Sequence, residues 1–248
     1  MPKLDLFSDK SDLYAKARPQ YPSSLFEFLA TQVPTNIKAW DCATGNGQAA
    51  LGLANYFREV YATDLSAQQI ENSFKKDNIT YSAQLAESTD FENESFDLIT
   101  VAQALHWFDY EKFWPEALRV LKPNGIFAAW GYSWFQINPE LDAILKTMLF
   151  DIIEPYWAAQ NKIAWRKYID INFPFETLQS PEFNMNTEWN YYQLMNYLHT
   201  WSATRRCMDA LGKDFFENSK KAIATVWGDL ETTRMIYMDV QIYVGRNS

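Results

Sequence analysis

An apolar strand that runs directly into a glycine turn and then into a helix constrains this chain most. Residues 37–40 have the apolar character of a buried strand, and Asp41 follows them. Gly45 and Gly47 then form a Gly-x-Gly turn, and residues 48–56 are typical of a helix. Such a turn directs backbone N–H groups and a helix N-terminus at one point in space. The sequence therefore predicts a loop that holds a polar or anionic ligand.

Strand and helix patterns alternate around this loop. The further strands are predicted at 59–64, 79–83, 95–103 and 126–130, and the helices at 23–31, 67–74 and 110–121. Ser66 is placed to cap the second of these helices. Residues 122–125, Lys-Pro-Asn-Gly, are typical of a turn. Strands separated by helices indicate right-handed crossovers and a mostly parallel, doubly wound α/β sheet.

The pattern changes after residue 131. Residues 139–162, 191–200 and 214–227 are typical of helices, and residues 183–190 and 235–244 of strands. No repeat, low-complexity tract or flexible linker occurs, so a single domain over 1–248 is expected. Its predicted parts are an N-terminal cap, a cofactor-binding core, a helical and aromatic insertion, and C-terminal strands and helices that complete the sheet: 1–34, 35–133, 134–182 and 183–248.

Composition excludes several classes of function. The 248 residues carry a net charge of −9 and no basic stripe, which argues against a nucleic-acid partner. No apolar run is long enough to span a membrane, and the first residues lack the pattern of a secretory signal. Two Cys and two His argue against a metal site formed by this chain, and nothing requires a disulfide. We expect a cytoplasmic protein; its oligomeric state stays open, and a monomer is compatible with the sequence.

Several motifs follow one another in a fixed order. They are Tyr14 with Arg18-Pro-x-Tyr-Pro22, Asp41-x-Ala-x-Gly-x-Gly-Gln48, Thr63-Asp-Leu-Ser66, Ala86-Glu87, Phe96-Asp-Leu-Ile99, Gln103-Ala-Leu-His-Trp-Phe108 and Arg119-Val-Leu-Lys-Pro-x-Gly125. In this order and spacing, the chain resembles the class I S-adenosylmethionine-dependent methyltransferases. It is most similar to their small-molecule group, which includes the trans-aconitate type. The resemblance covers residues 10–135 well and the remainder only by architecture.

This resemblance implies a fold and a cofactor. The fold is a Rossmann-like sheet of seven strands, the last antiparallel, with a helical insertion after the fifth strand that forms a lid. The cofactor is S-adenosyl-L-methionine, and no metal is implied. Gly45 and Gly47 would let the backbone approach its methionine half. Asp41 would face its ammonium, and Asp64 would accept hydrogen bonds from both ribose hydroxyls.

Further residues take roles by the same resemblance. Ala86 would offer its backbone N–H to the adenine, with Glu87 nearby, and Gln103 would lie beside the methionine moiety. Tyr14 and Arg18 would close over the cofactor carboxylate, for which a guanidinium is well suited. The implied cofactor site also includes the remaining positions of these motifs, Ala43, Gln48 and Leu65.

Two positions depart from the family pattern. Ala43 stands where many relatives have Gly. Leu85 stands where many relatives have an Asp that recognises the adenine amino group, which leaves Glu87 as a substitute.

The acceptor side of the site is predicted from His106 and a group of tryptophans. His106 follows the fourth strand and is a candidate general base; the alternative is that it only orders its loop. Trp107, Trp134 and Trp165 are candidates for the substrate pocket, although such residues are more often core. Arg166, Arg205 and Arg206 are candidates to pair with a substrate carboxylate, although surface arginines are common.

Two other functions remain open at this stage. Residues 45–50 match the Gly-x-Gly-x-x-Ala fingerprint of a dinucleotide-binding oxidoreductase, with Asp64 at a suitable distance. A protein that only binds S-adenosylmethionine would share the same loop. The prediction favoured by the motifs is methyl transfer to a small molecule by in-line displacement, on an oxygen of a carboxylate or hydroxyl group.

Overall fold

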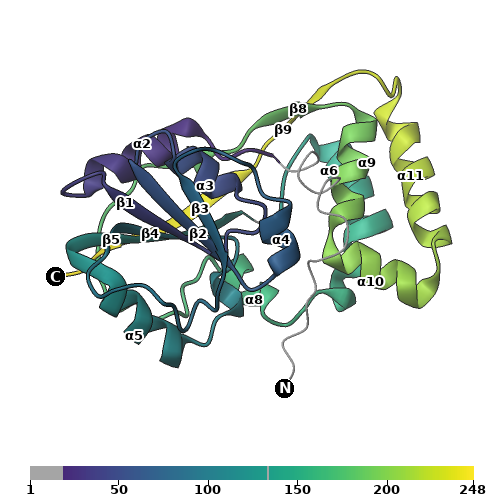
Figure 1. Ribbon diagram of the computed structural model, residues 1–248. Coiled ribbons are helices and arrows are strands. Elements are labelled where there is room, and N and C mark those ends of the chain that lie inside the picture. The colour runs from purple at the N-terminus through teal and green to yellow at the C-terminus, as the bar shows by residue number, and fades with distance from the viewer. Residues whose placement is uncertain (1–18, 133) are drawn as a thin grey trace.

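A computed structural model describes residues 19–132 and 134–248 of the chain. Its main sheet has the spatial order β3-β2-β1-β4-β5-β10-β6 (Figure 1). The parallel strands are β1 (Lys38–Cys42), β2 (Glu59–Asp64), β3 (Ile79–Ala83), β4 (Phe96–Ala102) and β5 (Leu121–Tyr132). The last strand, β10 (Asp239–Arg246), runs antiparallel to β5. This confirms the doubly wound α/β sheet with an antiparallel final strand.

The outer part of the sheet is short and divided. The two-residue strands β6 (Glu176–Thr177) and β7 (Phe183–Asn184) both pair antiparallel with β10. The strand predicted at 183–190 therefore ends early. Its second half forms β8 (Thr187–Trp189), which pairs with β9 (Arg234–Ile236) in a separate ribbon. The strand predicted at 235–244 is likewise interrupted, because Ile236 belongs to this ribbon and Asp239 to the main sheet.

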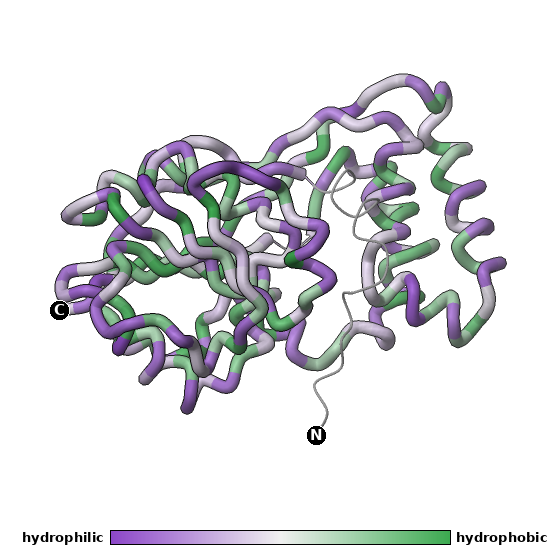
Figure 2. The backbone as a smooth tube through the Cα atoms, in the orientation of Figure 1, coloured by the Kyte–Doolittle hydropathy of each residue, from purple (hydrophilic) through white to green (hydrophobic). Residues whose placement is uncertain are grey.

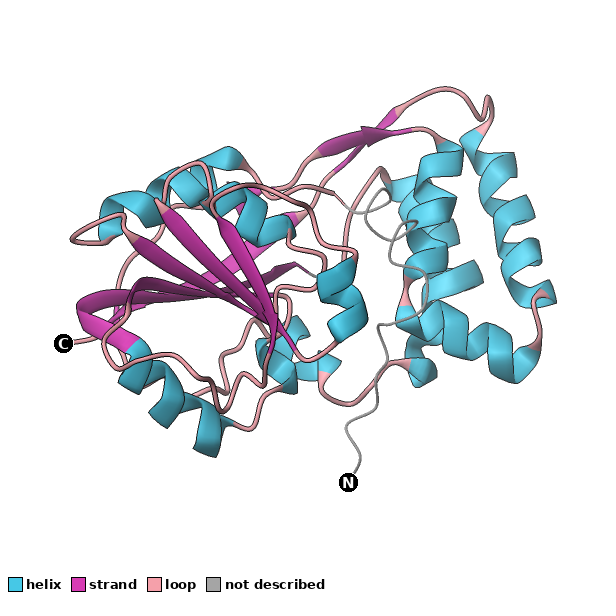
Figure 3. Cartoon of the chain, viewed as in Figure 1, coloured by secondary structure: helices cyan, strands magenta, loops and turns pink. Residues whose placement is uncertain are grey.

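Strand side chains alternate between two core layers. On β5, Ile126, Ala128 and Trp130 pack into one layer, and Phe127 and Ala129 pack into the other. This is the period of two expected for a strand that is covered on both faces. The first layer also takes the buried faces of α2 (Ser23–Gln32) and α3 (Gln48–Leu53), and the second that of α5 (Tyr110–Val120). Figure 3 shows these helices on opposite faces of the sheet.

A group of helices lies beyond one end of the sheet (Figure 1). It contains α6 (Pro139–Leu145), α9 (Tyr191–Thr200), α10 (Ser202–Leu211) and α11 (Asp214–Trp227). Their buried apolar residues belong to the same core layer as those of α2 and α3, and Figure 2 shows apolar stretches along these helices. Helices from both predicted C-terminal parts, 134–182 and 183–248, thus form one group. We call it the helical lobe.

The helix predicted at 139–162 is interrupted. After α6 the chain continues through a π-helical turn (Lys146–Phe150), α7 (Asp151–Ile153) and a 3-10 turn (Glu154–Tyr156). It leaves the helical conformation at Trp157, where ψ is 145°. A separate helix, α8 (Asn161–Trp165), follows. Pro155 lacks the N–H that a continuous helix needs, which accounts for the break.

Three more differences concern the lengths of two elements and one helix that was not predicted. The helix α4 (Ala67–Glu71) is shorter than predicted, although Ser66 caps it by accepting a hydrogen bond from Gln69 N at 3.3 Å. The strand β5 begins at Leu121, so residues 122–125 lie within it, with Asn124 in the left-handed region at φ 61°. The helix α10 was not predicted.

None of the helices in the described residues combines the length and apolar character that a membrane crossing requires.

Asp97 fastens the amino end of the sheet, away from the glycine turn. Its buried carboxylate accepts hydrogen bonds from Thr35 Oγ1 at 2.7 Å and from Lys122 Nζ at 2.9 Å. It also accepts from the backbone N–H groups of Ile37 at 3.2 Å and Lys38 at 2.8 Å. Burial raises the pKa of Asp97, but these hydrogen bonds, led by that from Lys38, hold the pKa below its ordinary value. One carboxylate therefore joins β4 to the start of β1 and to β5.

We expect Asp97→Ala to lower the free energy of unfolding by about 2–4 kcal/mol, because it leaves several donors unpaired. Urea denaturation measures this. The control is Asp151→Ala, which removes only an exposed ion pair to Lys146 and should change the free energy by less than about 0.5 kcal/mol. An equally small effect for both variants would contradict the role of Asp97.

Candidate functional site

The glycine turn leaves the carboxyl end of β1 in left-handed backbone conformations. The φ angles are 58° at Gly45 and 86° at Gly47, and Gly47 is the N-cap of α3. A Cβ atom at Gly47 would collide with the Tyr81 hydroxyl, whereas one at Gly45 would meet nothing within 4 Å. Gly47 thus leaves room for the Tyr81 hydroxyl, and Gly45 borders open space. Ala43 also has a positive φ, 56°.

Asp41 lies buried at the base of this turn. Its carboxylate accepts hydrogen bonds from Thr44 Oγ1 at 2.5 Å and from Thr100 Oγ1 at 3.0 Å. Burial raises the pKa of Asp41 to about 6, and the nearby charge of Asp64 adds to the effect. The bond to Thr100 ties the end of β1 to β4, so the ends of these neighbouring strands form one site.

Asp64 lies at the end of β2 and holds the turn from the other side. Its Oδ2 atom accepts a hydrogen bond from Gly45 N at 2.8 Å, and its Oδ1 atom accepts one from Ser66 N at 2.9 Å. Each carboxylate oxygen can accept a second hydrogen bond. Gln48 fixes the turn to the incoming chain, because its Nε2 atom donates to Pro19 O at 2.7 Å. Tyr14 and Arg18 lie outside the described residues.

Two exposed leucines, Leu65 and Leu85, lie just beyond the ends of the neighbouring strands β2 and β3. The backbones of Asp64 and Gln84 are hydrogen-bonded, because Gln84 N donates to Asp64 O at 3.0 Å. Leu65 and Leu85 directly follow these two residues. Their exposed fractions are 55% and 42%.

Ala86 and Glu87 continue this loop. Ala86 packs against the core layer under α5. Glu87 does not extend into open solvent; its Oε1 atom accepts a hydrogen bond from Asp109 N at 3.2 Å, at the start of α5. The Glu87 carboxylate therefore holds the loop against this helix.

Gln103 and His106 follow β4 on the other side of the glycine turn. Gln103 has a φ of 55°, and its Nε2 atom donates to Tyr132 O at 2.7 Å, so it spans the ends of β4 and β5. His106 is buried, and its ring lies 5.0 Å from that of Trp107. Burial lowers the pKa of His106 to about 4, which keeps the imidazole neutral near pH 7.

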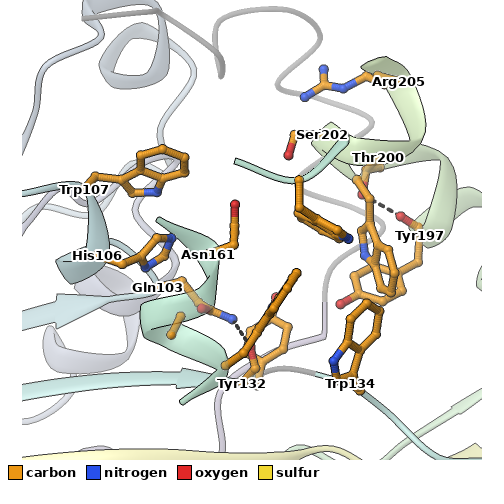
Figure 4. Close-up of a pocket in the computed structure, with 14 residues that line it drawn as sticks. Gln103, His106, Trp107, Tyr132, Trp134, Asn161, Tyr197, Thr200, Ser202 and Arg205 are labelled. Carbon is orange, nitrogen blue, oxygen red and sulfur yellow. Dashed lines mark hydrogen bonds between the residues drawn. The ribbon is translucent and has the colours of Figure 1, made fainter. Parts of the chain in front are cut away.

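A pocket of about 120 Å³ opens between these residues and the helical lobe (Figure 4). Its walls are mainly aromatic, with a few polar side chains and one arginine. They comprise Gln103, His106, Trp107, Tyr132, Trp134, Trp157, Asn161, Ala164, Trp165, Tyr197, Thr200, Trp201, Ser202 and Arg205. The structure thus brings together the predicted pocket residues His106, Trp107, Trp134 and Trp165, and adds Gln103, predicted for the cofactor.

A tryptophan cluster, Trp134, Trp157, Trp165 and Trp201, forms the far wall. The ring centroids of Trp134 lie 5.5 Å from Trp165 and 5.9 Å from Trp201, and those of Trp157 and Trp201 are 5.6 Å apart. Sequence reasoning missed Trp201 and Asn161. Trp201 lies between α9 and the unpredicted α10, so no helix pattern marked it.

The three candidate arginines lie in different surroundings. Arg205 lines the pocket from α10. Arg206 donates to Tyr156 O at 3.1 Å, and Arg166 pairs with Asp170 at 3.0 Å. Of the three, Arg205 is the one that lines the pocket.

Comparisons with known proteins identify the family of this chain. A family model described as a methyltransferase domain matches residues 40–129. A Dictyostelium discoideum protein, provisionally named a methyltransferase, is 32% identical over 248 residues, covering 97% of this chain and 93% of the relative. A Saccharomyces cerevisiae protein, provisionally named an S-adenosylmethionine-dependent methyltransferase, is 29% identical over 151 residues, covering 56% of this chain and 50% of the relative.

A solved structure supports the same assignment over almost the whole chain. It is that of a protein from Anaeromyxobacter dehalogenans, provisionally described as a type II methyltransferase. The two share 33% sequence identity and a TM-score of 0.86, with 92% of this chain and 97% of the other covered. The dinucleotide fingerprint at residues 45–50 is therefore part of a methyltransferase loop. The chain belongs to the class I S-adenosylmethionine-dependent methyltransferases.

Proposed function

We propose that this enzyme transfers a methyl group from S-adenosylmethionine to an oxygen atom of a small molecule in the aromatic pocket. The main support for the proposal is that the glycine turn and the aromatic pocket lie at the same edge of the sheet. Asp41 at the end of β1 bonds to Thr100 of β4 at 3.0 Å, and Gln103, three residues further along, lines the pocket. A donor held at the glycine turn would therefore lie beside the acceptor.

The residues around the glycine turn fit the donor. Open space beside Gly45 admits a ligand next to the backbone. Asp41 would stabilise the ammonium, and Asp64 would accept hydrogen bonds from the ribose hydroxyls. Gln103 would border the methionine half, and Gln48 would keep the incoming chain against the site. Tyr14 and Arg18 keep their proposed roles at the cofactor carboxylate.

We infer that the adenine is recognised mainly by apolar contact. Leu65 and Leu85 are exposed on adjacent strand ends, where a flat ring would cover both. The Ala86 backbone N–H would complete the contact. The carboxylate of Glu87 is engaged by Asp109 N, which disfavours its use as a direct substitute for the family's adenine-binding Asp.

The acceptor would need little activation. A sulfonium methyl group is already electrophilic, so alignment and exclusion of water supply much of the catalysis. The helical lobe would act as a lid that excludes water, and its aromatic walls suit a small organic acceptor.

Cys42 and Cys207 are buried free thiols, which fits a reducing compartment such as the cytoplasm.

Asp64→Ala should weaken binding of S-adenosylhomocysteine by about 1–3 kcal/mol, the scale for losing a charged hydrogen-bond partner. Isothermal titration calorimetry measures this, with Asp90→Ala as a control acid that bonds to Gln84 outside the turn. Unchanged affinity would refute the ribose assignment. Tight binding of NAD without a response to S-adenosylmethionine or S-adenosylhomocysteine would refute the proposed donor.

Binding of S-adenosylhomocysteine should release a proton near pH 6. In the free protein the pKa of Asp41 is about 6, so the carboxyl is partly protonated there. A cationic ammonium beside it would lower this pKa, since opposite charge favours the ionised form. Affinity should therefore increase by up to about tenfold for each unit that the pH is raised below pH 6, and it should level off above pH 7.

Calorimetry in buffers of different ionisation enthalpy counts the released proton. The variant Asp41→Asn should bind more weakly and lose the pH dependence between pH 5 and 7. A wild-type affinity that is flat over this range would contradict the role of Asp41.

A further inference from the structure

The aromatic pocket lies between two walls of rings. Figure 4 shows Trp107 and His106 on the side of the sheet edge, and Trp134 and Tyr197 on the side of the helical lobe. The lobe wall is accessible to a ligand, because Trp134 is 39% exposed. Exposed aromatic surface that lines a concave pocket is typical of a binding site. The surface of this pocket therefore indicates the shape and charge of its ligand.

The arrangement of the rings favours a flat ligand. In the tryptophan cluster, the rings of Trp134 and Trp165 lie 5.5 Å apart at an angle of 38°. Trp157 meets both nearly at right angles, at 6.3 Å and 5.7 Å. In the opposite wall, the rings of His106 and Trp107 lie 5.0 Å apart at 43°. Such faces and edges pack against an aromatic ring in stacked and edge-to-face contacts, which a saturated ring cannot match.

The volume of the pocket fits one ring. It is about 120 Å³. An apolar protein cavity of about 150 Å³ holds benzene, whereas pockets for drug-sized ligands have roughly 300–1,000 Å³. The pocket thus has room for a single ring with small substituents, and a fused ring system would exceed it.

The lining of the pocket favours an uncharged ligand. No Asp or Glu occurs among the described lining residues, so they offer no carboxylate to a cationic acceptor, which would also lie beside the cationic donor. The arginine of this lining, Arg205, already has an interaction partner in the protein. An anionic acceptor would have to compete with that partner. Because burial of an unpaired charge is unfavourable, a neutral acceptor fits this pocket best.

We propose, on the basis of the function proposed above, that the acceptor is an uncharged phenol with a single ring, methylated on its hydroxyl group. Gln103 and His106 follow β4 beside the proposed donor site, so the hydroxyl lies at their end of the pocket and the ring against the tryptophan cluster. The hydroxyl oxygen forms the new C–O bond with a lone pair, and the C–S bond of the donor breaks with its electron pair left on sulfur. The hydroxyl proton passes to water. The products are an aryl methyl ether, S-adenosylhomocysteine and a proton.

The first experiment compares acceptors of different charge by turnover. The full chain is incubated with S-adenosylmethionine and three phenols with different groups opposite the hydroxyl: 4-methylphenol, which is neutral, 4-hydroxybenzoate, which is anionic, and tyramine, which is cationic. We expect 4-methylphenol to give its methyl ether with a kcat/KM about tenfold or more above those of the charged phenols. A charged phenol that is methylated equally well or better would overturn the proposal, as would methylation of tyramine on nitrogen.

The second experiment tests shape and size by binding alone. Isothermal titration calorimetry on the protein loaded with S-adenosylhomocysteine compares 4-methylphenol with its saturated counterpart 4-methylcyclohexanol and with the fused-ring 2-naphthol. We expect 4-methylphenol to bind about tenfold or more tightly than either. Equal affinity for 4-methylcyclohexanol would overturn the selection of a flat ring. Equal or tighter binding of 2-naphthol would overturn the limit to a single ring.

The third experiment tests the lobe wall. Trp134→Leu should lower the affinity for 4-methylphenol about fivefold, and Trp134→Phe should restore part of it, because an aromatic contact returns. Both variants should bind S-adenosylhomocysteine like the wild type. The control Tyr192→Leu removes an exposed aromatic side chain outside the pocket lining and should leave both affinities unchanged. Equal affinity for 4-methylphenol in Trp134→Leu and the wild type would overturn the role of this wall.

Calorimetry with S-adenosylhomocysteine alone separates the two proposals. If S-adenosylhomocysteine binds the wild type but 4-methylphenol neither binds nor reacts, the acceptor proposal alone fails. If S-adenosylhomocysteine does not bind, the proposed donor fails with it.

Discussion

The buried carboxylate of Asp41 connects the parts on which the proposed site depends. It accepts one hydrogen bond from Thr44 in the glycine turn and one from Thr100 on the neighbouring strand. The end of β1, the turn and β4 are thereby held at one edge of the sheet. The same burial that makes this carboxylate a rigid support raises its pKa to about 6. A buried carboxylate with a raised pKa is typical of a functional site, and a cation bound beside it would stabilise its ionised form.

The two halves of the site are built differently. The proposed donor side uses backbone geometry and two acids, Asp41 and Asp64, and each of these acids lies at a strand end. The acceptor side uses side chains from both the sheet edge and the helical lobe, with Trp134 after β5 and Trp201 before α10. In this way, a cofactor-binding fold that is shared within a family is combined with a pocket that the helical lobe of this chain helps to form.

The features that could be predicted from the sequence depend on local chemistry. The strand β2, the cap at Ser66 and the turn at Gly45 and Gly47 all follow from residues that are close in the chain. The tryptophan cluster could be predicted only in part, because its members come from segments far apart in sequence. The ribbon of β8 and β9 was missed for the same reason, since strand patterns do not reveal which partner each half of a strand will choose.

The most direct measurement is a crystal structure of the protein with S-adenosylhomocysteine bound. We expect the molecule to lie along the glycine turn, with its ribose hydroxyls on Asp64 and its ammonium near Asp41. Its sulfur should lie beside Gln103 and face the pocket lined by His106 and the tryptophan cluster. A molecule bound away from the glycine turn, or with its sulfur facing away from this pocket, would contradict the proposed arrangement of donor and acceptor.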